Sequence, residues 1–208
     1  MKNFLFCSVL FTFCSCSSIK EAPHNRELLN NAPVGITSQE IIKSLTEEGG
    51  LGMTSYQVSG YPITKSLVKA WEREEKNDKA ALALADRSCF FFTISSKTLK
   101  EHLKFEEWPA KLLDAQKKEH KIIWHPTAVT ANPISQDTPT YHGKGDHWFN
   151  SGVGCTEDLI SLEEGFTIYL NPQQVQWPLG GDLKLDWVFD QKQLSEVKKN
   201  RKQDYRGW

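Results

Sequence analysis

Hydrophobic and polar residues alternate most regularly in the last third of the chain. The segments 166–170 (FTIYL) and 182–189 (DLKLDWVF) place every second side chain on an apolar face. A period of two is that of a β-strand with one face in the core and the other toward water. Turn signals at 171–172 (NP) and 178–181 (PLGG) separate the two segments. The pattern therefore predicts antiparallel strands, with Trp187 on the inward face.

A continuous apolar run at 88–95 (SCFFFTIS) has the length and composition of a strand. Aromatic and β-branched residues without alternation are typical of a strand covered on both faces, so we expect it at the centre of the sheet. Shorter runs predict strands at 53–59 and 122–124, the second ended or bent by Pro126. The polar segment 131–146, with two prolines and two glycines, predicts a long loop.

Helical periodicity is clearest in the first half of the chain. Thr37 and Glu40 form a capping box ahead of an apolar stripe. This pattern predicts a helix over 38–48, which the glycine pair beginning at Gly49 would end. A second helix is expected to start near Thr64, where another apolar stripe begins.

Together these elements predict a mainly β fold, an antiparallel β-sandwich with a helical N-terminal segment. An α+β layer fold is the alternative. We expect one globular domain over 37–208, helical in 37–87 and β-rich in 88–190. Within the β-rich part, the leucines of 99–113 predict short helices. Residues 191–208 are expected to form a short helix or a frayed tail.

The N-terminus has the anatomy of an export signal. Lys2 precedes an apolar run at 4–13, and small residues follow. The run is too short to span a bilayer, which takes roughly 20 residues. Cys16, after the small Ser15, resembles the lipobox of bacterial lipoproteins. The alternative is an ordinary signal peptide cut after Ser17.

The lipobox resemblance implies that residues 1–15 are removed and that Cys16 becomes an acylated first residue. Two or more acyl chains hold a protein on a membrane almost permanently. Ser17, by the same resemblance, favours the outer membrane over the inner one. The polar residues of 16–36 would then be the lipid anchor and tether. The expected location is the bacterial cell envelope, with the membrane as a partner through this anchor.

The composition of the chain limits the classes of partner that we expect. Acidic and basic residues nearly balance, with a formal net charge of −1. A balanced chain gives no electrostatic reason to expect nucleic acid or anionic lipid as a partner. The basic run at 198–202 is most simply a solvated terminus.

Cys89 and Cys155 are the two cysteines beyond the signal region. An exported chain meets an oxidising compartment, where such a pair usually forms a disulfide. The alternative is two buried free thiols that pack as small hydrophobic residues.

One segment combines side chains that bind metals. His142, Asp146 and His147 lie within the expected loop, and zinc takes such ligands. A further ligand, His120 or His125, would have to come from elsewhere. The spacing matches no recognised zinc motif, and the glycines argue against a helix. A metal-dependent hydrolase that uses these three residues is therefore only an alternative hypothesis. The preferred interpretation of the sequence includes no metal and no other cofactor.

Tryptophans support a binding function. Trp148 and Trp177 lie beside turns, where an exposed ring can stack on a sugar or anchor a protein partner. Packing in the core is the alternative for both. Because the chain carries no recognisable catalytic motif, we expect a non-enzymatic envelope lipoprotein that binds another envelope component. A glycan-binding module is a further alternative.

Overall fold

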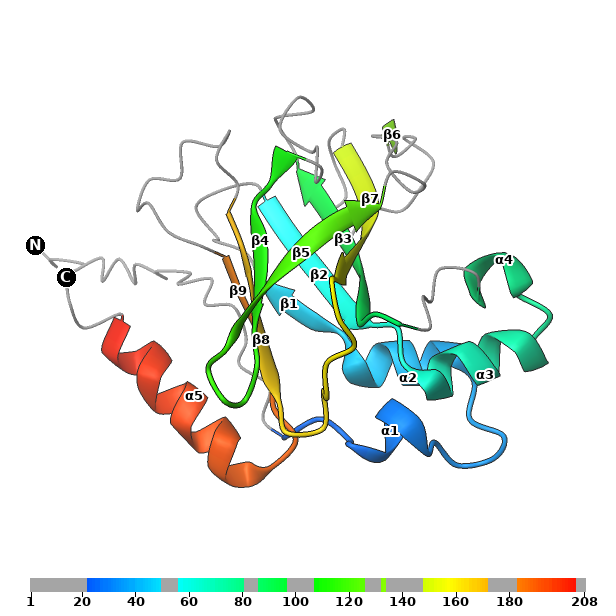
Figure 1. Ribbon diagram of the computed structural model, residues 1–208, viewed down its shortest axis with the longest axis horizontal. Helices are drawn as coiled ribbons and strands as arrows, with labels where there is room; N and C mark the ends of the chain where they lie inside the picture. Colours follow the sequence, from blue (N-terminus) through cyan, green and yellow to red (C-terminus); the bar gives the residue numbers. More distant parts are fainter. Residues whose placement is uncertain are drawn as a thin grey trace, which may run out of the picture.

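A single antiparallel sheet dominates the structure, with helices around one end and one side of it (Figure 1). The computed structural model describes residues 22–49, 56–80, 86–96, 107–125, 132–133, 148–171 and 183–204. The helices are α1 (Glu27–Asn30), α2 (Ser38–Leu45), α3 (Lys65–Arg73), α4 (Asn77–Ala80) and α5 (Gln191–Asp204). The strands are β1 (Glu47–Gly49), β2 (Tyr56–Pro62), β3 (Cys89–Ser96), β4 (Ala110–Leu113), β5 (Glu119–His125), β6 (Asn132–Pro133), β7 (Trp148–Thr156), β8 (Phe166–Leu170) and β9 (Leu183–Trp187).

The strands follow the order β1-β2-β3-β7-β5-β4-β8-β9, with β6 paired to β7. β5 joins the two halves of the sheet, because its first residues pair with β4 and its last four with β7. The outer strands then approach each other. A Cβ atom added to Gly49 of β1 would lie 2.9 Å from the Leu185 side chain of β9. The predicted mainly β class is confirmed; all strands belong to one nearly closed sheet, so the sandwich arrangement is not.

β3 is the central strand that its apolar sequence predicts. It pairs along its whole length with β2 on one side and β7 on the other. Phe90, Phe92 and Ile94 point into the sheet's interior and are almost completely buried. On the opposite face Cys89 is also buried, and Phe91 is half-buried. Burial on both faces explains why this strand shows no polar alternation.

Aromatic rings fill the interior from one half of the sheet to the other. Trp124 of β5 contacts Phe92 edge to face, with ring centroids 5.4 Å apart. Phe90 lies 5.5 Å from Phe166 of β8, which stacks on Trp187 of β9 at 4.8 Å. Trp187 is fully buried, as its alternation predicts, and its indole N–H donates to the Leu45 carbonyl at 2.7 Å.

The expected tether is too long. Residues from His24 onward belong to the folded domain, since Leu28 and Leu29 of α1 are buried in the core. The His24 backbone N–H donates to the Val188 carbonyl at 2.7 Å, and its imidazole Nε2 lies 2.9 Å from the Glu47 carboxylate. The sequence of this segment did not predict its contact with the domain. It is polar, contains two prolines, and forms a helix over only four residues, so it shows no sustained period.

Two helix predictions are also corrected. The first predicted helix ends at Leu45, not at 48, because Glu47–Gly49 pairs with β2 as strand β1. The leucines at 112 and 113 lie in β4, not in a helix, because this segment pairs with both β5 and β8. In both places pairing with another strand overrides the local preference. The helix expected near Thr64 is confirmed as α3, with Thr64 as its N-cap. Of the two alternatives expected after residue 190, a short helix or a frayed tail, the structure shows a helix, α5, over 191–204.

A carboxylate joins the helices α2 and α3. Thr37 and Glu40 form the predicted capping box at the start of α2. Glu74, at the end of α3, accepts hydrogen bonds from the Ser38 backbone N–H at 2.7 Å and the Ser38 hydroxyl at 2.6 Å. Lys76 lies 2.6 Å from the same carboxylate. Hydrogen bonds from Lys76 and Ser38 lower the pKa of Glu74 to about 2.

We predict that Glu74→Gln lowers the free energy of unfolding near neutral pH, and that this loss shrinks in acid. The folded-state pKa lies below the ordinary value of 4.5, so the stabilisation is complete above that value. It disappears as the pH falls through about 2. Urea unfolding of both proteins at several pH values between 6 and 2 measures the gap. Glu72→Gln on the same helix controls for removing one carboxyl group, and a gap that stays constant with pH would contradict the assignment.

We also predict that Gly60→Ala destabilises the fold by about 1–3 kcal/mol, the usual cost of overpacking a core. The added Cβ would lie 2.6 Å from Cδ1 of Phe92, whose ring Trp124 holds from the other side. Gly49→Ala is the matched comparison, because its Cβ would meet movable Leu185 methyl groups. Urea unfolding should rank Gly60→Ala as the less stable of the two; the reverse order would show that the Phe92 ring moves freely.

Candidate functional site

A cleft of about 300 Å³ lies between the start of α3 and the segment that joins β7 to β8. It brings together residues from four separate parts of the chain. They are Leu29, Asn30, Ile63, Thr64, Lys65, Arg87, Ser88, Leu159, Ile160, Ser161, Leu162 and Glu163. We call this site the α3 cleft. Its volume is at the lower end of the range for small-molecule and side-chain binding pockets.

A disulfide fixes the base of one wall. Cys89 of β3 and Cys155 of β7 are joined, with their Cα atoms 4.1 Å apart, as the sequence predicts. The Thr156 N–H donates to the Ser88 carbonyl at 2.9 Å, so the pair next to the cysteines is hydrogen-bonded across the strands. Cys89 and Cys155 therefore occupy a non-hydrogen-bonded position, where antiparallel strands bring side chains closest together. The strand register thus places the two sulfur atoms within bonding reach.

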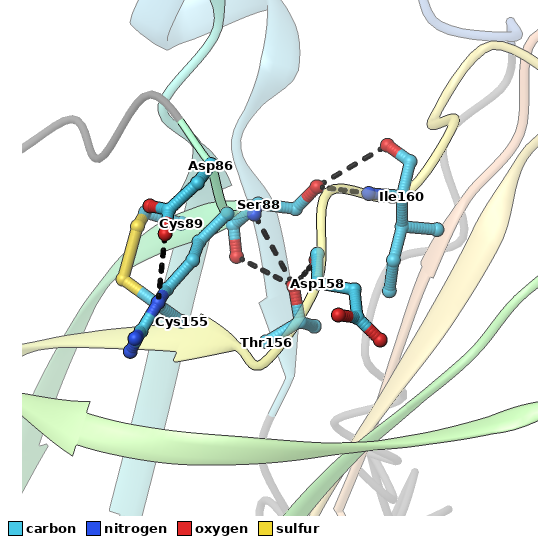
Figure 2. Close-up of a disulfide and its surroundings, with 8 residues drawn as sticks. Asp86, Ser88, Cys89, Cys155, Thr156, Asp158 and Ile160 are labelled. Atoms are coloured by element: carbon cyan, nitrogen blue, oxygen red, sulfur yellow. Dashed lines mark hydrogen bonds and ion pairs between the residues drawn. A yellow bond between two sulfur atoms is a disulfide. The ribbon is translucent and has the colours of Figure 1, made fainter.

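Ser88 connects this wall to the segment that borders the cleft (Figure 2). Its hydroxyl accepts a hydrogen bond from the Ile160 N–H at 2.9 Å and donates to the Ile160 carbonyl at 3.2 Å. The Thr156 hydroxyl donates to the Asp158 carbonyl at 2.6 Å. These bonds hold a loop without regular structure against the start of β3, so the wall is preorganised.

The opposite wall is set by the cap of α3. The Thr64 hydroxyl accepts from the Leu67 N–H and donates to the Leu28 carbonyl at 3.1 Å. One side chain therefore starts α3 and ties α1 to it. The same arrangement places Leu29 of α1 and Ile63 at the cleft. α1 is too short to persist alone, so this bond and the burial of its leucines keep it in place.

The cleft has an apolar floor and charged margins. Leu29 is buried, while Ile63, Ile160 and Leu162 pack half-buried against the core. Leu159 lines the cleft and is 61% exposed, so its side chain is accessible to another molecule.

Arg87 and Lys65 supply positive charge, and Glu163 supplies one negative charge. Asn30 donates to the Glu163 carboxylate at 2.6 Å, which holds that acid to α1. The Nε atom of Arg87 is buried and makes no hydrogen bond to the described residues; the Asp86 carboxylate lies 3.8 Å away. Arg87 therefore pairs with Asp86, and together with Lys65 it provides the basic groups of the cleft lining.

The chemistry of the cleft follows from the side chains that line it. Among the described residues, that lining contains no histidine or cysteine. Its two buried hydroxyls are both engaged, that of Ser88 by the Ile160 backbone and that of Thr64 by Leu28 and Leu67. A serine without an adjacent base is a weak nucleophile. The arrangement therefore offers shape, apolar contact and positive charge.

Most site residues predicted from sequence lie outside the described residues. These are Cys16, His142, Asp146, His147 and Trp177. Trp148 is the first residue of β7, but its side chain is not described.

The two other histidines considered as metal ligands, His120 and His125, lie within the described residues. His120 contacts the Asp114 carboxylate at 2.9 Å, and this hydrogen bond lowers the pKa of Asp114. His125 is half-buried at the end of β5, paired with Val153. In the described part of the chain, no three His, Cys, Asp or Glu side chains are arranged to hold a metal ion.

Sequence reasoning did not find the α3 cleft. Arg87 stands alone before an apolar strand, and Leu159 lies between acidic residues and a turn. Each is ordinary in its own segment. The one available signal was the disulfide prediction, because joining positions 89 and 155 places their neighbours side by side.

The fold class is therefore a mainly β domain with one nearly closed antiparallel sheet and a helical N-terminal segment. No family model, curated protein or solved structure matches the chain. Among the described residues, none of the helices combines the length and the apolar character needed to cross a bilayer.

We predict that the Cys89→Ala, Cys155→Ala double variant loses about 4 kcal/mol of stability. The bond closes a loop across 66 positions, and the chain-entropy model gives this value for such a loop. Urea unfolding of the variant measures the loss, and the wild-type protein under reducing conditions should unfold at nearly the same urea concentration. Equal midpoints for the oxidised wild type and the variant would contradict a stabilising disulfide.

Proposed function

We propose that this protein is a cell-envelope lipoprotein, anchored through an acylated Cys16, that binds a protein partner in the α3 cleft without catalysing a reaction. Two features support the location: the export signal with its lipobox resemblance, and a disulfide of the kind that forms in oxidising compartments. By the same resemblance, Ser17 favours the outer membrane. The observation that carries the binding function is the cleft, whose lining combines apolar side chains with the basic residues Lys65 and Arg87.

The size of the cleft favours a segment of a protein. About 300 Å³ accommodates one or two side chains, whereas drug-sized ligands usually occupy larger sites. Leu159 projects at the rim and would be covered by the rest of the partner. Apolar anchors of this kind, surrounded by polar groups, carry most of the binding energy in protein interfaces.

The charged residues of the cleft determine which peptide segments could bind there. Arg87 and Lys65 favour a partner that carries a carboxylate next to its apolar side chain. Glu163 is held by Asn30, and Arg87 is paired with Asp86 at 3.8 Å, so a partner carboxylate would compete with Asp86 for the Arg87 guanidinium. The proposed ligand is therefore a short peptide segment with an apolar residue beside an acidic residue or a terminal carboxylate.

Site-specific photo-cross-linking on the full chain, in its own membrane, tests this proposal. A photoreactive residue at position 159 should give a discrete adduct with one partner. The same residue at Val34, which is 99% exposed and does not line the cleft, is the matched control and should give none. The charge reversal Arg87→Glu should abolish the adduct, while Lys121→Glu on β5 should leave it unchanged. Identical products from positions 159 and 34, or an adduct that survives Arg87→Glu, would rule out the cleft as the binding site.

Synthetic peptides from the cross-linked segment then give the contribution of charge. Replacing the carboxylate by an amide should weaken binding about tenfold or more, since hydrogen bonds to charged groups contribute about 1.5–3 kcal/mol. Equal affinity of the acid and the amide would leave apolar contact as the sole basis of recognition.

A further inference from the structure

Helix α5 is strongly basic in a chain whose net charge is −1. Its sequence, QKQLSEVKKNRKQD, contains five basic and two acidic residues. Leu194 is buried against the sheet, while Lys192 and Lys199 are exposed. These two lysines are seven residues apart, which is two turns, so they lie on the same outward face. The basic run expected to be a solvated terminus is thus part of a structured helix.

The same helix starts beside the point where the chain enters the domain. His24, near the first described residue, is bonded to Val188, which lies three positions before α5. The His24 ring also lies 5.7 Å from that of Phe189. Figure 1 shows the N-terminal segment entering next to the first turn of α5, on the side away from α3 and α4. The entry point and the basic helix are therefore fixed to each other.

This placement limits how far α5 can lie from an anchored lipid. Only six positions separate Cys16 from Ala22, the first described residue. Six extended residues reach at most about 20 Å. A fourteen-residue helix is about 21 Å long, so a chain anchored at Cys16 keeps Ala22, near the start of α5, within about one helix length of the membrane surface.

We propose that the outward face of α5 rests on anionic phospholipid headgroups and so orients the domain on its membrane. This inference depends on the proposed acylation of Cys16, which supplies the anchor. The lipid chains hold the protein at the bilayer, and the lysines then select one orientation. Polybasic segments next to a lipid anchor act in this way, and each Lys or Arg near an anionic surface adds to the attraction. Glu196 lies one turn from both Lys192 and Lys199, so it offsets part of their charge, and its side chain also borders the β4–β5 turn and β8.

Amine labelling of the full, acylated protein on vesicles tests the orientation. The protein is inserted into vesicles of phosphatidylcholine alone, or with one third phosphatidylglycerol, and the modification of each lysine is read by mass spectrometry. Labelling of Lys192 and Lys199 should fall about fivefold on the anionic vesicles, the factor expected for a basic residue held at such a surface. Salt at about 0.5 M should restore it, because the Debye length is then only a few ångströms.

Lysines on α3 and α4 provide the controls. Lys69 is exposed on α3, so its labelling should not depend on phosphatidylglycerol. The double reversal Lys192→Glu, Lys199→Glu should remove the protection along α5, whereas Lys69→Glu, Lys79→Glu makes the same charge change elsewhere and should preserve it. Equal labelling of the α5 lysines on both vesicle types would overturn the orientation while leaving the anchor intact. A mature chain whose mass includes no acyl groups at Cys16 would overturn the anchor and, with it, this orientation.

Discussion

A chain of aromatic contacts through the interior holds the two halves of the sheet together. β5 provides the backbone link between the halves, but it pairs with each of them over only a few residues. The rings of Trp124, Phe92, Phe90, Phe166 and Trp187 cross the gap from β5 to β9. Aromatic side chains bury the largest areas and prefer tilted contacts of this kind. Glycines on the neighbouring strands leave room for the rings, so the sheet's curvature and its filling depend on each other.

The α3 cleft follows from how this sheet is covered. The N-terminal helices close one end, and the segment after β7 returns along their edge. Where the two meet, Thr64 fixes the helical side, and Ser88, next to the disulfide, fixes the other. Neither wall needs the ligand in order to form. A site assembled in this way loses little conformational entropy on binding, which favours recognition of a short flexible segment.

Local pattern in the sequence was sufficient for elements whose local preference and long-range pairing agree. Alternation located β8 and β9, an unbroken apolar run located β3, and a threonine cap located α3. Local pattern was insufficient where the local preference of a segment conflicts with its long-range strand pairing. The leucines of β4 are good helix formers, yet two neighbouring strands fix them as a strand. The cleft could not be predicted at all, because its walls come from segments up to 134 positions apart, Leu29 to Glu163. No pattern of nearby residues in the sequence indicates that segments so far apart in the chain are in contact.

The bond between His24 and Val188 spans 164 positions, and the one between Trp187 and Leu45 spans 142. Both join the start of the domain to its end, so neither can form before β9 is available. During synthesis the N-terminal residues emerge first and must wait for nearly the whole domain to follow. Contacts of such long range also fold slowly. A chain with this topology therefore completes its sheet only after almost all of its residues are available, whereas Cys89 and Cys155 can pair earlier.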